Sequence, residues 1–172
     1  MADLMWVANT RHGPGAHWFA RPSSDEGDHD HLVVPADAVR YLADHHVEVP
    51  ESEPTARQLA ALGVISDMVR GLPDSSGGWT DAAEGLRSQA RYRIATDGQL
   101  GAAVPGWDGF IDDLMLPLTE LVRSRSRLAM CGNQDCRLVF VDESKSHTRR
   151  WCDDGGCGNR VRLRRHRRRM PD

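Results

Sequence analysis

Four cysteines in the last quarter of the chain constrain its fold more than any other feature of the sequence. They are the only cysteines among 172 residues, and they form two pairs with the spacing Cys-x4-Cys: Cys131 with Cys136, and Cys152 with Cys157. Tetrahedral zinc favours thiolate ligands, and such short spacings let one turn of the chain supply two of them. The pattern therefore predicts a small module in which all four cysteines hold one structural zinc ion.

Other interpretations of the four cysteines are free buried thiols, a redox dithiol switch, or an iron–sulfur cluster, whose usual spacings differ. Disulfides are disfavoured if the thiols stay reduced. The opening residues show no basic start followed by a long apolar run, and no stretch approaches 18 uninterrupted apolar residues. We therefore expect a cytoplasmic protein without a membrane span.

The residues around the cysteines support a compact metal module. A β-rich run covers residues 138–141, and a polar turn then leads to the Arg149-Arg150-Trp151 segment. This order predicts a hairpin between the two cysteine pairs. Neither glycine nor proline occurs from Asn159 to Met170, which predicts a helix that begins near the fourth ligand, with Val161 facing the module.

Charge is divided unevenly along the chain, although the whole carries only −3. Residues 1–120 contain 8 arginines and 19 carboxylates, for a net charge of −11. Residues 121–172 contain 14 basic and 6 acidic side chains, for a net charge of +8. The division indicates an acidic body and a basic end that faces a polyanion.

The first 120 residues have the periodicity of a mostly helical domain. The apolar spacing predicts helices over residues 35–47, 54–73, 80–91 and 107–123, the last despite Pro117. Two short runs around Asp97-Gly98 predict a β-hairpin. The predicted fold class is α+β, with a mainly helical domain at 1–123 and a zinc finger with a basic C-terminal helix at 124–172.

No catalytic constellation stands out in this body. We find no nucleophile with an adjacent base, no paired-carboxylate site and no phosphate loop, and four cysteines would leave zinc no open position for water. We therefore expect a protein that is not an enzyme. The run from Asp28 to His31 could bind a metal, but an acidic loop is the better prediction, because neighbouring residues rarely converge on one ion without outside ligands. The same holds for His45 and His46.

The C-terminal module resembles the CGNR zinc-finger family, which takes its name from the motif found here as Cys157, Gly158, Asn159 and Arg160. The resemblance covers about forty residues, and one departure is the acidic DDGG segment between the last two cysteines. It also includes the following residues: Cys131, Asn133, Cys136, Phe140, Asp142, Ser144, Arg149, Arg150, Trp151 and Cys152. In this family the finger usually follows a helical domain called ABATE. The first 120 residues look like such a domain, with VANT near its start and TDG in the hairpin.

The resemblance implies a bacterial transcription regulator that binds DNA through the finger, and the arginines support polyanion binding independently. Most of them would contact phosphates, and a few could read guanine edges. Asn159 could contact an adenine, although fixing the turn is the favoured role, and Arg149 and Arg150 could instead be structural beside Trp151. The candidate nucleic-acid-binding residues are Lys145, Arg149, Arg150, Asn159, Arg160, Arg162, Arg164, Arg165, Arg167, Arg168 and Arg169.

The sequence leaves several functions and partners open. Duplex DNA is favoured over RNA, because the basic tail offers no aromatic side chain after Trp151 on which bases could stack. An RNA- or ribosome-associated zinc module and a redox-responsive zinc switch remain alternatives. The N-terminal domain would sense a small-molecule effector, form a homodimer or contact other partners.

Overall fold

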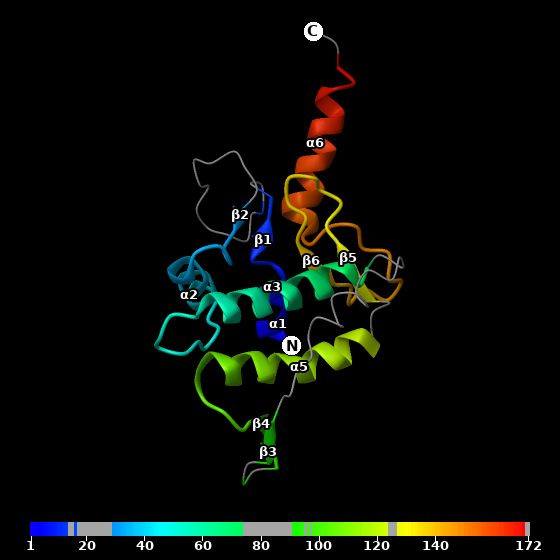
Figure 1. The fold of residues 1–172 in the computed structure, drawn as a ribbon. Coiled ribbons are helices and arrows are strands. Elements are labelled where there is room, and N and C mark those ends of the chain that lie inside the picture. Colours follow the sequence, from blue (N-terminus) through cyan, green and yellow to red (C-terminus); the bar gives the residue numbers. More distant parts are fainter. Residues whose placement is uncertain are drawn as a thin grey trace.

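The computed structural model describes residues 1–13, 16, 29–73, 91–94, 96, 98–123 and 127–170. These residues form five α-helices and three separate two-stranded antiparallel sheets. The predicted α+β class is therefore confirmed. Figure 1 shows a helical body with one helix projecting from it toward the C-terminus and a small hairpin projecting from the opposite end.

The body is built around a short buried helix. Helix α1 (Ala2–Ala8) packs against α3 (Ala56–Gly71) and α5 (Gly106–Arg123), and Leu4 and Val7 of α1 are completely buried. Helix α2 (Pro35–Asp44) adds its buried face to the same core. Burial of these apolar faces stabilises helices that would be marginal alone.

Three of the predicted helices are confirmed. Helix α3 begins after Thr55, which forms a reciprocal capping box with Gln58 and so satisfies backbone groups at the helix start. Helix α5 contains Pro117, as predicted. Helix α2 is shorter than predicted, because His46 has a φ of 60° that no helix allows. The helix predicted over 80–91 lies outside the described residues except for Arg91.

The hairpin predicted around Asp97-Gly98 is also confirmed, as strands β3 (Tyr92–Ile94) and β4 (Leu100–Ala102). A second hairpin was not predicted. Strand β1 (Arg11–His12) pairs with β2 (His29–Asp30), which lies in a segment that the sequence predicted to be a loop. Each strand is two residues long, too short to show an alternating pattern.

The hairpin predicted between the cysteine pairs is wrong in its pairing. Strand β6 (Val139–Val141) forms from the expected run, but it pairs with β5 (Leu128–Met130), which precedes the first cysteine. The first cysteine pair therefore lies in the connection between the two strands. The polar turn returns without forming a strand, and Asp142 holds it by accepting hydrogen bonds from the backbone N–H groups of Ser144 and Arg149, at 2.9 and 2.8 Å.

The body and the cysteine module share a core. Leu128 and Val139 of the β5–β6 hairpin belong to the same apolar cluster as α1, α3 and α5. Asn9 extends this contact, because its side chain donates to the Val139 carbonyl and accepts from the Val139 N–H, both at 2.9 Å. The Gly13 N–H donates to the Cys136 carbonyl at 3.0 Å. Among the described residues, no helix is both long and apolar enough to cross a membrane.

Candidate metal centre and basic helix

The four cysteines converge on one point, although they come from two separate turns of the chain. Their Sγ atoms all lie within 4.8 Å of one another, and all four residues are buried. The Sγ atom of Cys152 lies 3.7 Å from those of both Cys136 and Cys157. Sulfurs bound to tetrahedral zinc at about 2.3 Å would be about 3.8 Å apart. The cluster is thus a zinc-finger site that fits one structural zinc ion.

The close sulfurs also shift the pKa values of Cys131, Cys136 and Cys152. Hydrogen bonds from Cys136 and Cys152 lower the pKa of Cys131. The same contacts with Cys131 raise the pKa of Cys136, and they raise that of Cys152 to about 12. A bound divalent cation offsets the repulsion among several thiolates, and this is the chemistry that zinc would supply here.

The first cysteine turn is organised by Asn133, which is 1% exposed. Its Nδ2 donates to the Sγ atom of Cys157 at 3.5 Å, so it reaches from the first cysteine pair to the second. Its Oδ1 accepts from the backbone N–H of Asp135 at 3.4 Å. Backbone N–H groups of Asn133 and Leu138 hydrogen-bond to the sulfurs of Cys131 and Cys136 and favour the thiolate form of each, although contacts with the other cysteines still raise the pKa of Cys136.

The second cysteine turn uses the acidic DDGG segment as a structural element. Residues Asp154–Gly158 form a wide π-helical turn, which Asp153 caps by accepting a hydrogen bond from the Gly156 N–H at 2.6 Å. Gly158 of the CGNR motif lies in a tight position. A Cβ atom there would lie 2.9 Å from Cδ1 of Trp151 and 2.6 Å from Oδ1 of Asp154. The motif glycine therefore lets the helix start pack against the tryptophan.

Helix α6 (Asn159–Arg167) begins directly after this turn, as predicted, and carries the basic cluster. Two of its arginines bind carboxylates of the module itself. Arg162 pairs with Asp154 at 2.9 Å, and Arg164 pairs with Asp135 at 2.5 Å. Arg164 also donates to Oδ1 of Asn133 at 2.5 Å. These contacts fix the base of the helix to both cysteine turns.

The remaining predicted residues occupy two regions. Arg149 lies over the Phe140 ring and donates to the carbonyls of Trp151 and Cys152, while Arg150 lies over the Trp151 ring. Lys145 is exposed on the polar turn. The others lie exposed on or just beyond α6, and they are Asn159, Arg160, Arg165, Arg167, Arg168 and Arg169.

One expected role falls to a different residue. We expected Asn159 to fix its turn by bonding the backbone, but within the described part of the chain its exposed side chain makes no hydrogen bond. Asn133 and Asp153 fix the two turns instead. No role was expected for Asn9 or Asp135. The Asn9 contact spans 130 positions, and no local signal could have identified it.

Comparison with known proteins agrees with the geometry of the site. Residues 127–170 match the family model of the CGNR zinc finger. The match covers all four cysteines, β5, β6 and α6, which is about a quarter of the chain. A comparison with curated proteins finds no match.

Proposed function

We propose that this chain is a zinc-dependent, DNA-binding transcription regulator, with a binding rather than a catalytic role. Its finger and α6 would contact duplex DNA. Residues 1–123 would form an ABATE-like domain that senses an effector, forms a homodimer or contacts partners, and residues 124–172 would form the DNA-binding domain.

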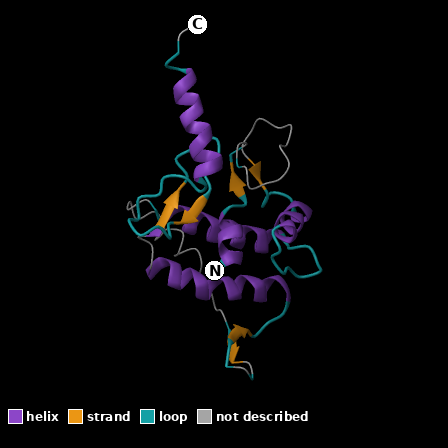
Figure 2. Ribbon diagram, turned by 180° about the vertical axis from the view of Figure 1, so that it is seen from behind, coloured by secondary structure: helices purple, strands orange, loops and turns teal. Residues whose placement is uncertain are grey.

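The exposed basic helix carries this proposal. Helix α6 extends away from the body in both views, and none of its residues is buried (Figures 1 and 2). A short helix without an apolar face gains little from packing, so its stability depends on its attachment to the zinc turn. The side chains of such a helix are available to a partner. Its many exposed arginines favour binding to a polyanion.

The contacts of the arginines divide them into two groups with different roles. Arg162 and Arg164 bind Asp154 and Asp135, so they position the helix. Four others are exposed and form no ion pair with any residue that the structure describes, and they are Arg165, Arg167, Arg168 and Arg169. This second group would supply the phosphate contacts, with one or two arginines reaching guanine edges in a major groove.

Selection from a pool of random duplex DNA tests the proposal most directly. The zinc-loaded full-length protein is used at about 150 mM salt, which suppresses binding through phosphates alone. An enriched motif would support sequence-specific recognition, and a palindromic motif would indicate a dimer. The absence of enrichment would contradict it, and tighter binding to structured RNA than to duplex DNA would favour the RNA alternative.

The role of α6 is tested by charge removal. Changing Arg165, Arg167 and Arg168 together to glutamine should weaken DNA binding and reduce the salt slope by about 0.9 for each phosphate that is no longer neutralised. The matched control changes Arg40, Arg57 and Arg93 of the body to glutamine. It removes the same number of positive charges from a part of the chain that is distant in sequence from α6. An equal weakening of binding in both variants would place the interface elsewhere.

A further inference from the structure

Histidines are concentrated in one part of the body. Six of the eight in the chain lie between residues 12 and 46. The β1–β2 hairpin places His12 opposite His29, and the His31 side chain returns toward the same point. The Nε2 atoms of His12 and His31 lie 3.2 Å apart. Neighbouring residues rarely bind one metal ion without a ligand from elsewhere in the chain. His12, which comes from a separate strand, could be that ligand for the segment from His29 to His31.

Hydrogen bonding prepares His12 to bind a metal ion. Its Nδ1 lies 3.0 Å from the Gly13 carbonyl, which can only accept, so Nδ1 carries the proton in the neutral ring. The lone pair of Nε2 then points toward His31. Histidine ligands of metals commonly donate their other ring N–H to a backbone carbonyl in this way, which fixes the tautomer and the ring orientation.

His31 is held in place by aromatic packing. Its ring stacks on Tyr41 with centroids 4.5 Å apart and planes 20° apart. Tyr41 is itself fixed, because its hydroxyl donates to the Asn9 carbonyl at 3.0 Å. Burial lowers the pKa of His12 to about 4 and also lowers that of His31.

The distances suit a transition-metal ion. Two imidazole nitrogens bound at about 2.05 Å to a tetrahedral ion would be about 3.3 Å apart, close to the separation seen here. The centroid of the His29 ring lies 5.1 Å from the centroid of the His12 ring and 6.0 Å from that of the His31 ring. His29 and His12 line the same cavity of about 300 Å³. Rotation of the half-buried His29 side chain would bring it in as a third ligand.

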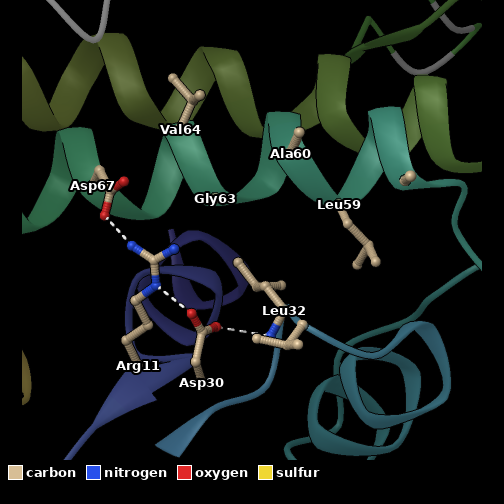
Figure 3. A pocket seen from close by; sticks show the side chains of 10 residues that line it. Arg11, Asp30, Leu32, Leu59, Ala60, Gly63, Val64 and Asp67 are labelled. Atoms are coloured by element: carbon tan, nitrogen blue, oxygen red, sulfur yellow. Dashed lines mark hydrogen bonds and ion pairs between the residues drawn. The ribbon is translucent and has the colours of Figure 1, made fainter.

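The backbone of this hairpin is anchored by charged groups, which include two arginines that also line the cavity. Arg11 bonds Asp30 at 2.8 Å and Asp67 of α3 at 2.6 Å (Figure 3). The other oxygen of Asp30 accepts from the Leu32 N–H at 3.0 Å. Arg70 donates to the Arg11 carbonyl at 2.9 Å. The two strands are thereby held against α3, so the His12 and His31 side chains project from a fixed frame.

We propose that His12, His31 and His29 form a second metal site, separate from the cysteine cluster. Its ion would be a divalent transition metal of the kind that imidazole binds, such as zinc, nickel or copper. A water molecule or a small anion from the cavity would complete the coordination. The site does not depend on DNA binding, so either proposal can fail without the other.

The test uses the zinc-loaded full-length protein and nickel(II) alone as the probe. Equilibrium dialysis should show one nickel ion bound per chain with no loss of zinc. His31→Phe keeps the ring that stacks on Tyr41 but removes the ligand nitrogens, and His12→Gln provides a second variant. Each should lower nickel affinity by at least about tenfold. Nickel should raise the melting temperature of the wild type but not that of the variants.

His46→Asn is the matched control, because it removes a nearby imidazole at a position with positive φ that asparagine tolerates. It should bind nickel like the wild type. Zinc content and circular dichroism establish that each variant is folded. Absence of a nickel ion from the wild type, or unchanged affinity in both folded variants, overturns the proposal. Unchanged affinity in His29→Ala would remove His29 from the site.

Discussion

At the scale of single residues, Asn133 shows how one buried amide can couple the two halves of a metal site. It lies in the first cysteine turn, donates to the sulfur of Cys157 in the second, and accepts from Arg164 of α6. Mutation of groups that orient metal ligands typically lowers metal affinity by about 10- to 100-fold. Asn133 therefore connects zinc binding to the position of the basic helix.

Asn133→Ala should lower zinc affinity by about 10- to 100-fold, because the hydrogen bond to the Cys157 sulfur is removed. Competition with a chromogenic chelator measures the change. Gln134→Ala is the control, since that neighbouring side chain is exposed. Equal zinc affinities in the two variants would show that Asn133 acts only by filling space.

Gly13, like Gly158, is a glycine whose identity the structure explains. A Cβ atom at this position would lie 2.2 Å from the Asp135 carbonyl oxygen, so no larger residue fits between β1 and the first cysteine turn. Gly13→Ala should lower the free energy of unfolding by about 1–3 kcal/mol, the usual cost of overpacking. Denaturant unfolding of the zinc-loaded protein measures it. Gly101→Ala is the control, because a Cβ there meets nothing within 4 Å. An equal destabilisation in both variants would contradict the close approach.

At the scale of elements, α6 and the two cysteine turns depend on the metal, whereas the body helices depend on apolar packing. None of the α6 residues is buried, while α3 and α5 contribute many side chains to the core. Chelation of zinc should therefore abolish amide-exchange protection in the two cysteine turns and α6, residues 131–136 and 152–167, and preserve it in α3 and α5. Hydrogen exchange before chelation, after chelation and after zinc is restored measures this directly. Persistent protection of α6 after complete zinc removal would contradict it.

The elements that could be predicted are those with a local chemical cause. The cysteine spacing identified the metal cluster, apolar periodicity identified α3, and Asp97-Gly98 identified the β3–β4 hairpin. The pairing of β6 with β5 could not be predicted, because it depends on the distant Asn9 and on a core shared with α1. The histidine pair was missed for the same reason. His12 and His31 are 19 positions apart, and their contact requires the β1–β2 hairpin, whose strands are two residues long.

At the scale of the whole molecule, the acidic and basic parts of the chain lie in different regions, and yet they share one core. In the described part of the chain, Arg162 and Arg164 of the basic helix form ion pairs with Asp154 and Asp135 of their own module. Suppression of non-specific DNA binding by the acidic body would therefore act through its long-range field, and its effect would fall with added salt. The finger and the body are also joined by direct contacts. Leu128 and Val139 pack in the core of the body, and Asn9 bonds Val139.

This joint should make the two parts unfold together. Asn9 is 6% exposed and uses both its amide N–H and its oxygen on Val139. Asn9→Asp would place a carboxylate oxygen against the Val139 carbonyl, where neither group can donate. The variant should be destabilised by about 1–3 kcal/mol, the cost of leaving a buried polar group unsatisfied. Asn159→Asp makes the same chemical change at an exposed position and serves as the control.

Cobalt-substituted protein allows the two parts to be followed separately during heating. Circular dichroism reports mainly on the helical body, and the cobalt–thiolate absorption reports on the cysteine cluster. In the wild type and in the Asn159→Asp control, the two signals should melt at one temperature, because the shared core makes unfolding cooperative. In Asn9→Asp the cobalt signal should disappear first, because the finger is released from a body that is still folded. Coincident melting curves in Asn9→Asp, at the wild-type temperature, would mean that Leu128 and Val139 join the parts without help from Asn9.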